Sequence, residues 1–309
     1  MQVQNGSDQR FDTRRPVFLT LGMFDGMHQG HLALIRHLLH WARSRAGFAA
    51  ILTFDRHPRG ITRGTAPPAI TPISQKIYLA SRLGVDGMVV LPFTRELADV
   101  PAMEFLKSTI IEGLGAKNIL IGFDNRFGKG GEGSFDMLRT VAPELGLSVR
   151  QGTPVRLGGA SISSTAIREA VQNGKLALAE KLLGRKFSGF GTVVSGQQKG
   201  HGRGFPTANI KPLHSLAPPP GIYATITRLG NSFHPSATFV APDAYESSGS
   251  RLVESHLIGY EGDLYGAEIE VIFLEHIRTN KRFEHSAALT AAIADDVRRA
   301  YTAACSIRL

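Results

Sequence analysis

Residues 17–31, VFLTLGMFDGMHQGH, decide the fold of the N-terminal half of the chain. The segment VFLTL at 17–21 is an apolar run of the length typical of a short buried strand. A turn rich in glycine and histidine follows, and apolar residues then recur at helical spacing over residues 31–46. A strand, a tight turn and a helix in this order form the ligand crevice of an α/β sheet, at the carboxyl ends of its strands.

The remainder of the first half repeats this alternation. Short apolar runs at residues 49–54, 88–91 and 118–121 predict further strands, and residues 103–114 have helical spacing. This rhythm predicts an α/β fold with a doubly wound parallel sheet. Residues 1–15 are polar and lack the apolar core of a secretory signal, so we expect residues 1–14 to form a disordered tail.

Two short helices are predicted at residues 165–171 and 176–183, and the sequence pattern changes after Gly184. Strand-like segments follow at 187–195, 221–228, 252–258 and 267–274, separated by loops rich in glycine and proline. This pattern predicts an antiparallel β unit, either a barrel or a sandwich, and residues 286–304 predict a terminal amphipathic helix. We place the boundary between two domains, 1–185 and 186–309.

Composition narrows the class of protein. The chain has 309 residues, of which 42% are hydrophobic, enough for two domains with separate cores. No apolar run reaches the roughly 18 residues of a membrane-spanning helix, and the single cysteine, Cys305, cannot form an internal disulfide. These features predict a cytoplasmic protein. The net charge of +9 favours an anionic partner, either nucleic acid or a phosphorylated small molecule.

The turn after the first strand is a candidate phosphate site. Gly22, Gly26 and Gly30 allow the backbone to bend tightly and to approach a ligand, and a helix start offers free N–H groups to phosphate. His28 and His31 are three residues apart, so on a first helical turn they face the same side. Two imidazoles there can hold a triphosphate and stabilise the leaving pyrophosphate. A glycine-rich turn with two ordinary histidines is the alternative, and a metal site is disfavoured because no third ligand lies nearby.

A second segment supports this site. Residues 161–168, SISSTAIR, begin a predicted helix. Hydroxyl groups of Ser163, Ser164 and Thr165 can cap that helix or bind phosphate oxygens, and Arg168 can bind an anion through two N–H groups. An ordinary helix cap is the alternative. Together the two segments favour nucleotidyl transfer, in which positioning and charge stabilisation supply the catalysis.

The segment GQQKGHGRGFPTAN at residues 196–209 is a candidate site in the second half. Its glycines, among them Gly196, Gly202 and Gly204, offer backbone N–H groups to phosphates, although the loop has no Walker A pattern. Thr207 and Asn209 carry hard oxygen ligands suited to Mg²⁺ beside phosphate oxygens. A glycine-rich hairpin loop is the alternative.

Several separated motifs, in order, resemble bacterial bifunctional riboflavin kinase/FAD synthetases. The adenylyltransferase half of that family is similar at residues 22–31 (GMFDGMHQGH), 52–58 (LTFDRHP), 122–128 (GFDNRFG) and 162–168 (ISSTAIR). The kinase half is similar at residues 182–185 (LLGR), 206–209 (PTAN), 221–224 (GIYA), 253–257 (VESHL) and 262–266 (GDLYG). The resemblance extends from residue 17 to the last helix.

This resemblance implies a Rossmann-like nucleotidyltransferase domain and a riboflavin kinase domain that is an antiparallel β-barrel with a terminal helix. The implied reactions are phosphorylation of riboflavin to FMN by Mg²⁺ and ATP, and adenylylation of FMN to FAD with release of pyrophosphate. The ligands are then ATP, riboflavin, FMN and FAD, with no tightly bound prosthetic group, no nucleic acid and no membrane. The implied ATP pocket of the transferase comprises His28 and His31 as catalytic residues with Gly22, Phe24, Asp25, Gly26, Ser163, Ser164, Thr165 and Arg168, and Asp124 near the flavin or nucleotide. The implied kinase site comprises Gly196, Gly202 and Gly204, with Thr207 and Asn209 holding Mg·ATP and Glu254 as the base for the ribityl 5′-hydroxyl.

The chain departs from the family pattern at a few positions. Met23 stands where the family usually has Asn, Asn125 where it has Phe, and Gly259 where Asp is common. The segment 236–245, SATFVAPDAY, replaces an N-I-G-x-x-P-T-F-like loop that covers the flavin. One alternative is therefore that only one activity is live, with the transferase weakened at Met23 or the kinase at 236–245. A flavin- or RNA-binding regulator is another, and it predicts a basic stripe on one face. The sequence leaves the oligomeric state open.

Overall fold

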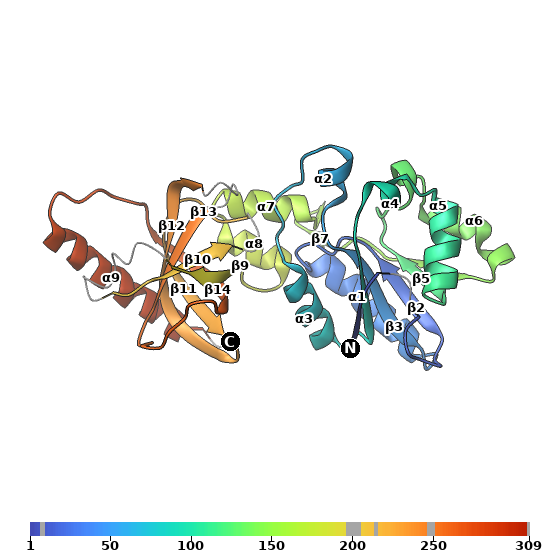
Figure 1. Ribbon diagram of the computed structural model, residues 1–309, viewed down its shortest axis with the longest axis horizontal. Coiled ribbons are helices and arrows are strands. Elements are labelled where there is room, and N and C mark those ends of the chain that lie inside the picture. The colour runs from blue at the N-terminus through green and yellow to red at the C-terminus, as the bar shows by residue number, and fades with distance from the viewer. Residues whose placement is uncertain (7–9, 196–204, 213–215, 246–250, 308–309) are drawn as a thin grey trace. The chain divides into compact units, whose positions relative to one another are not determined.

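The computed structural model describes residues 1–6, 10–195, 205–212, 216–245 and 251–307 (Figure 1). The chain divides into two compact units. The first comprises residues 1–67 and 73–163, and the second comprises residues 68–72 and 164–309. Each unit has its own sheet and core, and each is described by itself.

The first unit is built on a six-stranded parallel sheet with the strand order β1-β4-β3-β2-β5-β6. Its strands are β1 (Gln2–Asn5), β2 (Val17–Leu21), β3 (Phe48–Phe54), β4 (Gly87–Leu91), β5 (Ala116–Ile121) and β6 (Ser148–Gln151), and a small hairpin pairs β7 (Arg156–Leu157) with β8 (Ala160–Ser161). Its helices are α1 (Gln29–Arg43), α2 (Pro58–Thr62), α3 (Ile73–Leu83), α4 (Arg95–Asp99), α5 (Ala102–Glu104), the π-helix η1 (Phe105–Gly113), the 3-10 turn η2 (Lys129–Gly131) and α6 (Phe135–Leu145). The predicted parallel α/β fold is confirmed.

Helices cover both faces of this sheet, as a doubly wound fold requires (Figure 1). Alternation along β2 sends Leu19 into one core, with Phe105 and Ile110 of η1. Phe18 enters the opposite core with Leu38 of α1, where α3 also packs. The sheet is therefore buried on both sides, which explains why its strands read as continuous apolar runs.

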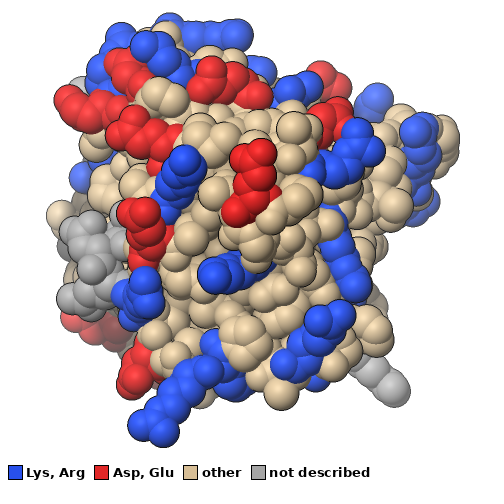
Figure 2. Space-filling model, turned by 90° about the vertical axis from the view of Figure 1, so that its right-hand side faces the viewer, with Lys and Arg blue, Asp and Glu red and all other residues tan. Residues whose placement is uncertain are grey.

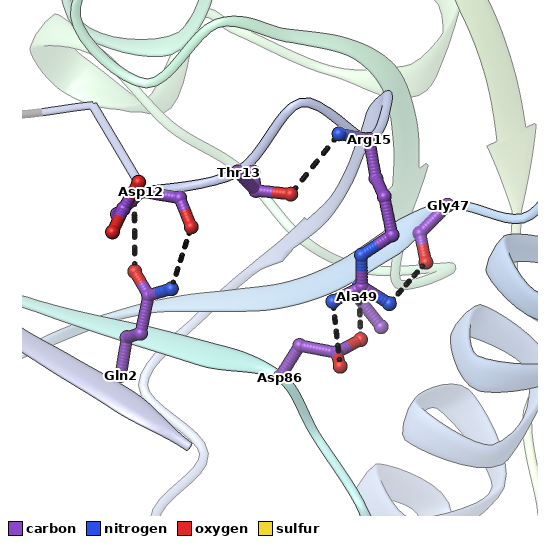
Figure 3. Close-up of polar contacts among 7 residues, drawn as sticks. All are labelled: Gln2, Asp12, Thr13, Arg15, Gly47, Ala49 and Asp86. Carbon is purple, nitrogen blue, oxygen red and sulfur yellow. Dashed lines mark hydrogen bonds and ion pairs between the residues drawn. The ribbon is translucent and has the colours of Figure 1, made fainter.

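The prediction of a disordered tail at residues 1–14 is wrong. Strand β1 pairs in parallel with β4, and the Gln2 side chain exchanges hydrogen bonds with the backbone of Asp12 (Figure 3). Phe11 is buried against Phe48, with 4.9 Å between the ring centroids. Arg15 then pairs with Asp86 at 3.0 Å. A strand at the edge of a sheet tolerates polar residues, so its composition resembles that of a tail.

The second unit is a closed six-stranded antiparallel barrel, which decides between the predicted barrel and sandwich. The strands β9 (Ser188–Val194), β10 (Ala208–Pro212), β11 (Gly221–Leu229), β12 (Ser232–Tyr245), β13 (Arg251–Leu257) and β14 (Glu268–Arg278) have the neighbour order β10-β13-β12-β11-β14-β9. Helices α7 (Ser164–Gln172) and α8 (Leu176–Leu183) precede the barrel, and α9 (Ser286–Cys305) follows it. A bidentate ion pair between Arg278 and the buried Asp296 ties β14 to α9.

Two segments expected to be loops are strands. Residues 236–245 lie in β12, because Ser236, Thr238 and Val240 alternate into the barrel interior and their backbone pairs with β11 and β13. Ala208 and Asn209, which end the predicted glycine-rich loop, lie in β10 between β9 and β13.

The barrel interior contains a buried cluster of hydroxyl groups. Thr225 contacts the hydroxyls of Ser236 at 2.8 Å and Thr238 at 2.7 Å, and Thr238 contacts that of Ser255 at 2.9 Å. Thr227 joins both Ser236 and Ser255. These hydroxyls satisfy one another, so a polar interior is compatible with a stable barrel. Across the described part of the chain, no helix combines the length and apolar character needed to cross a membrane.

Candidate functional site

The first candidate site lies at the point where the strand order of the parallel sheet reverses. The chain continues from β2 outward through β3 and β4 on one side and through β5 and β6 on the other. The loop 22–28 leaves the carboxyl end of β2, and residues 122–125 leave that of β5. A crevice opens between such divergent connections, and ligands of α/β sheets bind there.

The loop after β2 holds an unusual backbone conformation. Phe24 and Met27 have φ values of 48° and 41°, and Gly26 between them has φ of 85°. Left-handed conformations cost free energy in residues other than glycine, so the surrounding contacts must hold this loop in place. The carbonyl oxygen of Met23 accepts hydrogen bonds from Lys76 Nζ at 2.8 Å and from Thr53 Oγ1 at 3.1 Å.

His28 and His31 are brought together as predicted, although the helix begins earlier than expected. His28 is the N-cap of α1, and its Nδ1 accepts the backbone N–H of His31 at 3.3 Å. The two imidazoles stack with 3.7 Å between their centroids, and the edge of Phe24 contacts His31 at 5.1 Å. Gly30 lets the backbone approach the His28 ring closely, since a Cβ at this position would lie 3.2 Å from it.

Burial and neighbouring charge set the protonation of this site. Burial lowers the pKa of His31 well below its ordinary value, and the charges of His28 and Lys76 lower it further. The Nδ1 atom of His31 is buried without a hydrogen-bond partner among the described residues. Burial also lowers the pKa of Lys76, and the charge of the buried Asp25 offsets part of that effect. His31 is therefore a neutral ring at neutral pH.

The residues after β5 lie beside the same loop. Asn125 donates a short hydrogen bond from its side chain to the carbonyl oxygen of Leu21, at the end of β2. Asp124 is exposed, and Phe123 keeps 42% of its surface accessible. An exposed aromatic ring and carboxylate at the switch point can contact a planar or hydroxylated ligand.

The predicted segment 163–168 is divided between the two units. Ser163 ends the first unit, where the preceding carbonyl oxygen of Ile162 lies 3.8 Å from the Cβ position of Gly30. Ser164, Thr165 and Arg168 belong to α7 in the second unit. Arg168 is buried there, and its Nε donates to the carbonyl oxygen of Pro68 at 2.7 Å. The grouping of Arg168 with the histidines stays a prediction.

The second candidate site is built on two paired strands of the barrel. Asn209 of β10 lies directly opposite Glu254 of β13, and Ala208 lies opposite Ser255. Directly opposed residues share one face of an antiparallel pair and have close Cβ atoms. Thr207 immediately precedes β10, so the three predicted residues Thr207, Asn209 and Glu254 occupy neighbouring positions.

A cavity of about 350 Å³ adjoins these strands. It is lined by Thr207 and Asn209, by residues of the barrel wall, and by the turn that follows β13; the lining residues are Val193, Pro206, Thr207, Ala208, Asn209, Ser255, Leu257, Tyr260, Glu261, Gly262, Asp263, Leu264 and Tyr265. Glu254 is not among these lining residues, although its strand position is opposite Asn209. The predicted phosphate-binding residues Gly196, Gly202 and Gly204 lie outside the described residues.

Comparison with known proteins assigns each half of the chain to a family. A family model for FAD synthetase matches residues 11–166, and one for riboflavin kinase matches residues 183–304. The bifunctional riboflavin kinase/FMN adenylyltransferase of Haemophilus influenzae is 36% identical over 303 residues, covering 97% of this chain and 98% of that protein. The chain belongs to the bifunctional riboflavin kinase/FMN adenylyltransferase family.

Further relatives carry the same name. The Escherichia coli K12 protein is 34% identical over 90% of each chain, and that of Bacillus subtilis is 30% identical over 91% of this chain and 90% of its own length. A crystal structure described as a macrolide-efflux protein from Streptococcus pneumoniae aligns with a TM-score of 0.82 at 26% identity. The alignment covers 96% of this chain and 98% of that one, so the two chains share both folds.

Three departures from the family pattern have structural roles in this chain. Met23 contributes its backbone carbonyl, which Lys76 and Thr53 hold, so the loop is anchored without a side-chain amide. Asn125 fastens the end of β2 through Leu21. Gly259 has φ of 75°, a left-handed turn that glycine adopts without strain.

Sequence reasoning missed several residues of the two sites. Lys76 lies on α3, a helix that the sequence pattern does not predict, and a lone lysine forms no motif. His256 lies within the VESHL motif, Tyr265 lies within GDLYG and Tyr260 precedes it by two positions, and the motifs assign no role to these three side chains. The signal that finds Tyr260 and Tyr265 is their place at the cavity, which depends on the fold of the barrel.

Proposed function

We propose that the chain phosphorylates riboflavin in its C-terminal domain and adenylylates the resulting FMN in its N-terminal domain, with ATP as the donor for both. The observation that carries this proposal is that one chain contains two separately built sites. One is a histidine stack at the switch point of a parallel sheet, and the other is the Asn209–Glu254 pair in a barrel. We propose that the two catalytic domains divide at residues 185 and 186.

In the N-terminal reaction, a phosphate oxygen of FMN attacks the α-phosphorus of ATP, and the bond to pyrophosphate breaks. His28, His31 and the N-terminal N–H groups of α1 bind the phosphates and stabilise the charge that develops on pyrophosphate. The stacked rings of His28 and His31, which lie where α1 begins, support this role. The proposed ATP pocket also includes Gly22, Phe24, Asp25, Gly26, Ser163, Ser164, Thr165 and Arg168, with Asp124 beside the flavin or nucleotide.

In the C-terminal reaction, the ribityl 5′-hydroxyl attacks the γ-phosphorus of ATP, its proton passes to Glu254, and ADP leaves. Thr207 and Asn209 hold the Mg·ATP substrate, because hydroxyl and amide oxygens suit Mg²⁺ that keeps its phosphate ligands. The cavity beside Thr207 has the volume of a small-ligand site.

A product assay tests the proposal. Purified protein is incubated with ATP, Mg²⁺ and riboflavin, and FMN and FAD are separated by chromatography. We expect both products, with FMN preceding FAD. FMN without FAD indicates an inactive N-terminal domain, and FAD formed only from added FMN indicates an inactive kinase. Absence of both products refutes the proposal.

A flavin- or RNA-binding regulator is the alternative from another class. It predicts a basic stripe on one face, and on the face in Figure 2 the Lys and Arg side chains are separated by uncharged surface. The net charge of +9 is instead explained by anionic ligands, and we propose ATP, riboflavin, FMN and FAD as the ligands of a cytoplasmic enzyme. Failure of turnover together with salt-sensitive RNA binding would favour the regulator.

A further inference from the structure

His256 makes a contact that neither of the two proposed reactions has yet used. Its Nδ1 lies 2.7 Å from the carbonyl oxygen of Pro206, the residue before Thr207. A carbonyl oxygen only accepts hydrogen bonds, so Nδ1 carries the proton and donates it. The edge of the imidazole also contacts the Phe205 ring, with 5.6 Å between centroids and 85° between planes.

The strand register places the contact between His256 and Pro206 next to both Glu254, the proposed base, and Thr207, which is proposed to bind Mg·ATP. His256 follows Glu254 by two positions on β13, so both side chains leave the same face of the strand. Across the β10–β13 pair, Glu254 faces Asn209 and Ser255 faces Ala208, which brings His256 beside Thr207. The side chain therefore joins the strand that bears the base to the turn that bears Thr207.

We propose that His256 is a positioning residue of the riboflavin kinase site: its Nδ1–H holds Pro206, and through it Thr207, in place to bind Mg·ATP. The inference rests on the proposed role of Thr207. Pro206 has no N–H with which to join the β10–β13 ladder, so its carbonyl is the backbone group available for anchoring this turn. Pro206 and Thr207 both line the cavity next to Asn209, so a displaced turn changes the shape of the nucleotide site.

Two substitutions separate the hydrogen bond from the ring. His256→Phe keeps a ring beside Phe205 and removes the donor. His256→Asn removes the ring, and its Nδ2 stands near the former position of Nδ1 and donates. We expect His256→Phe to raise the KM for ATP on the order of 10-fold, the effect of one lost hydrogen bond, with a smaller change in kcat and in the KM for riboflavin. His256→Asn should restore the KM for ATP to near the wild-type value.

The controls distinguish this inference from the proposed function. His285→Phe introduces the same change at the exposed N-cap of α9, where the side chain makes no capping hydrogen bond, and should leave kinase kinetics unchanged. Thr207→Ala should strongly reduce FMN formation; if it does not, the proposed function of Thr207 fails. If Thr207→Ala is defective and His256→Phe behaves as wild type, only the positioning role fails. Equal defects in the Phe and Asn variants, including loss of turnover in both, also overturn the role of the donor.

Discussion

Replacing Lys76 with methionine tests whether one buried side chain holds the loop of the first site. Met has a similar length, so the substitution removes the ammonium group without opening a large cavity. The Lys76 side chain is buried, and its 2.8 Å hydrogen bond to Met23 has a charged donor. Such bonds contribute about 1.5–3 kcal/mol, so we expect the N-terminal unit to lose about 2 kcal/mol, or roughly 4–8 °C in Tm.

The assay uses the single tryptophan of the chain. Trp41 is buried in α1 against Phe18, with Arg150 stacked over its ring, so its fluorescence reports unfolding of the first unit alone. Urea titrations followed at this residue give the free energy of unfolding. The rate of FAD formation from FMN should fall by more than the loss of folded protein explains, because the strained loop at residues 24–27 loses an anchor. FMN formation by the barrel should be unchanged.

Lys107→Met is the matched control, since Lys107 is exposed on η1. It should alter stability by no more than about 0.5 kcal/mol and leave both activities intact. The reasoning is refuted if Lys76→Met unfolds at the same urea concentration as Lys107→Met and still converts FMN to FAD at the wild-type rate.

The remaining predictions concern three further positions. His31→Ala should lower FAD formation by about 100-fold and spare FMN formation; equal loss of both products contradicts the assignment of sites to domains. Burial lowers the pKa of His31, so the unfolded chain protonates this ring before the folded chain does as the pH falls through 6.5. The wild type should therefore lose stability on acidification, and His31→Ala should lose less, as measured by Trp41 fluorescence. Glu254→Gln should lower FMN formation by about 100-fold or more while FMN is still adenylylated, and unchanged kinase turnover would remove Glu254 as the base. Thr225→Val should destabilise the barrel by about 1–3 kcal/mol in calorimetry, since Ser236 and Thr238 lose a buried partner; an unchanged transition would show that the hydroxyl cluster contributes little.

The buried strands of the first unit were predictable because both faces of the sheet are covered. Continuous apolar runs such as residues 17–21 follow directly from that burial. Strand β6, SVRQ, was not predicted, because it is a polar edge strand that is paired on one side. The same applies to β1. Strand β12 escaped prediction for another reason, since its inward-facing residues include Ser236 and Thr238, hydroxyls that a pattern of apolar alternation does not recognise.

The candidate site was predictable where its residues are close in sequence. His28 and His31 are joined by a single helical turn, so their stacking follows from local spacing. The contact between Lys76 and Met23 depends on the packing of α3 against the sheet, and the contact between His256 and Pro206 depends on strand register. Neither contact can be predicted from a local sequence pattern. The pairing of Asn209 with Glu254 was reached only through the resemblance to a family.

Strand β1 has a practical consequence for work with truncated forms of this protein. It closes one side of β4, whose other side is already paired with β3. Removing the first residues would leave the backbone N–H and C=O groups along one side of the apolar strand β4 without hydrogen-bond partners. A second molecule can dock its own strand there, so shortened preparations should self-associate even though both catalytic halves are intact.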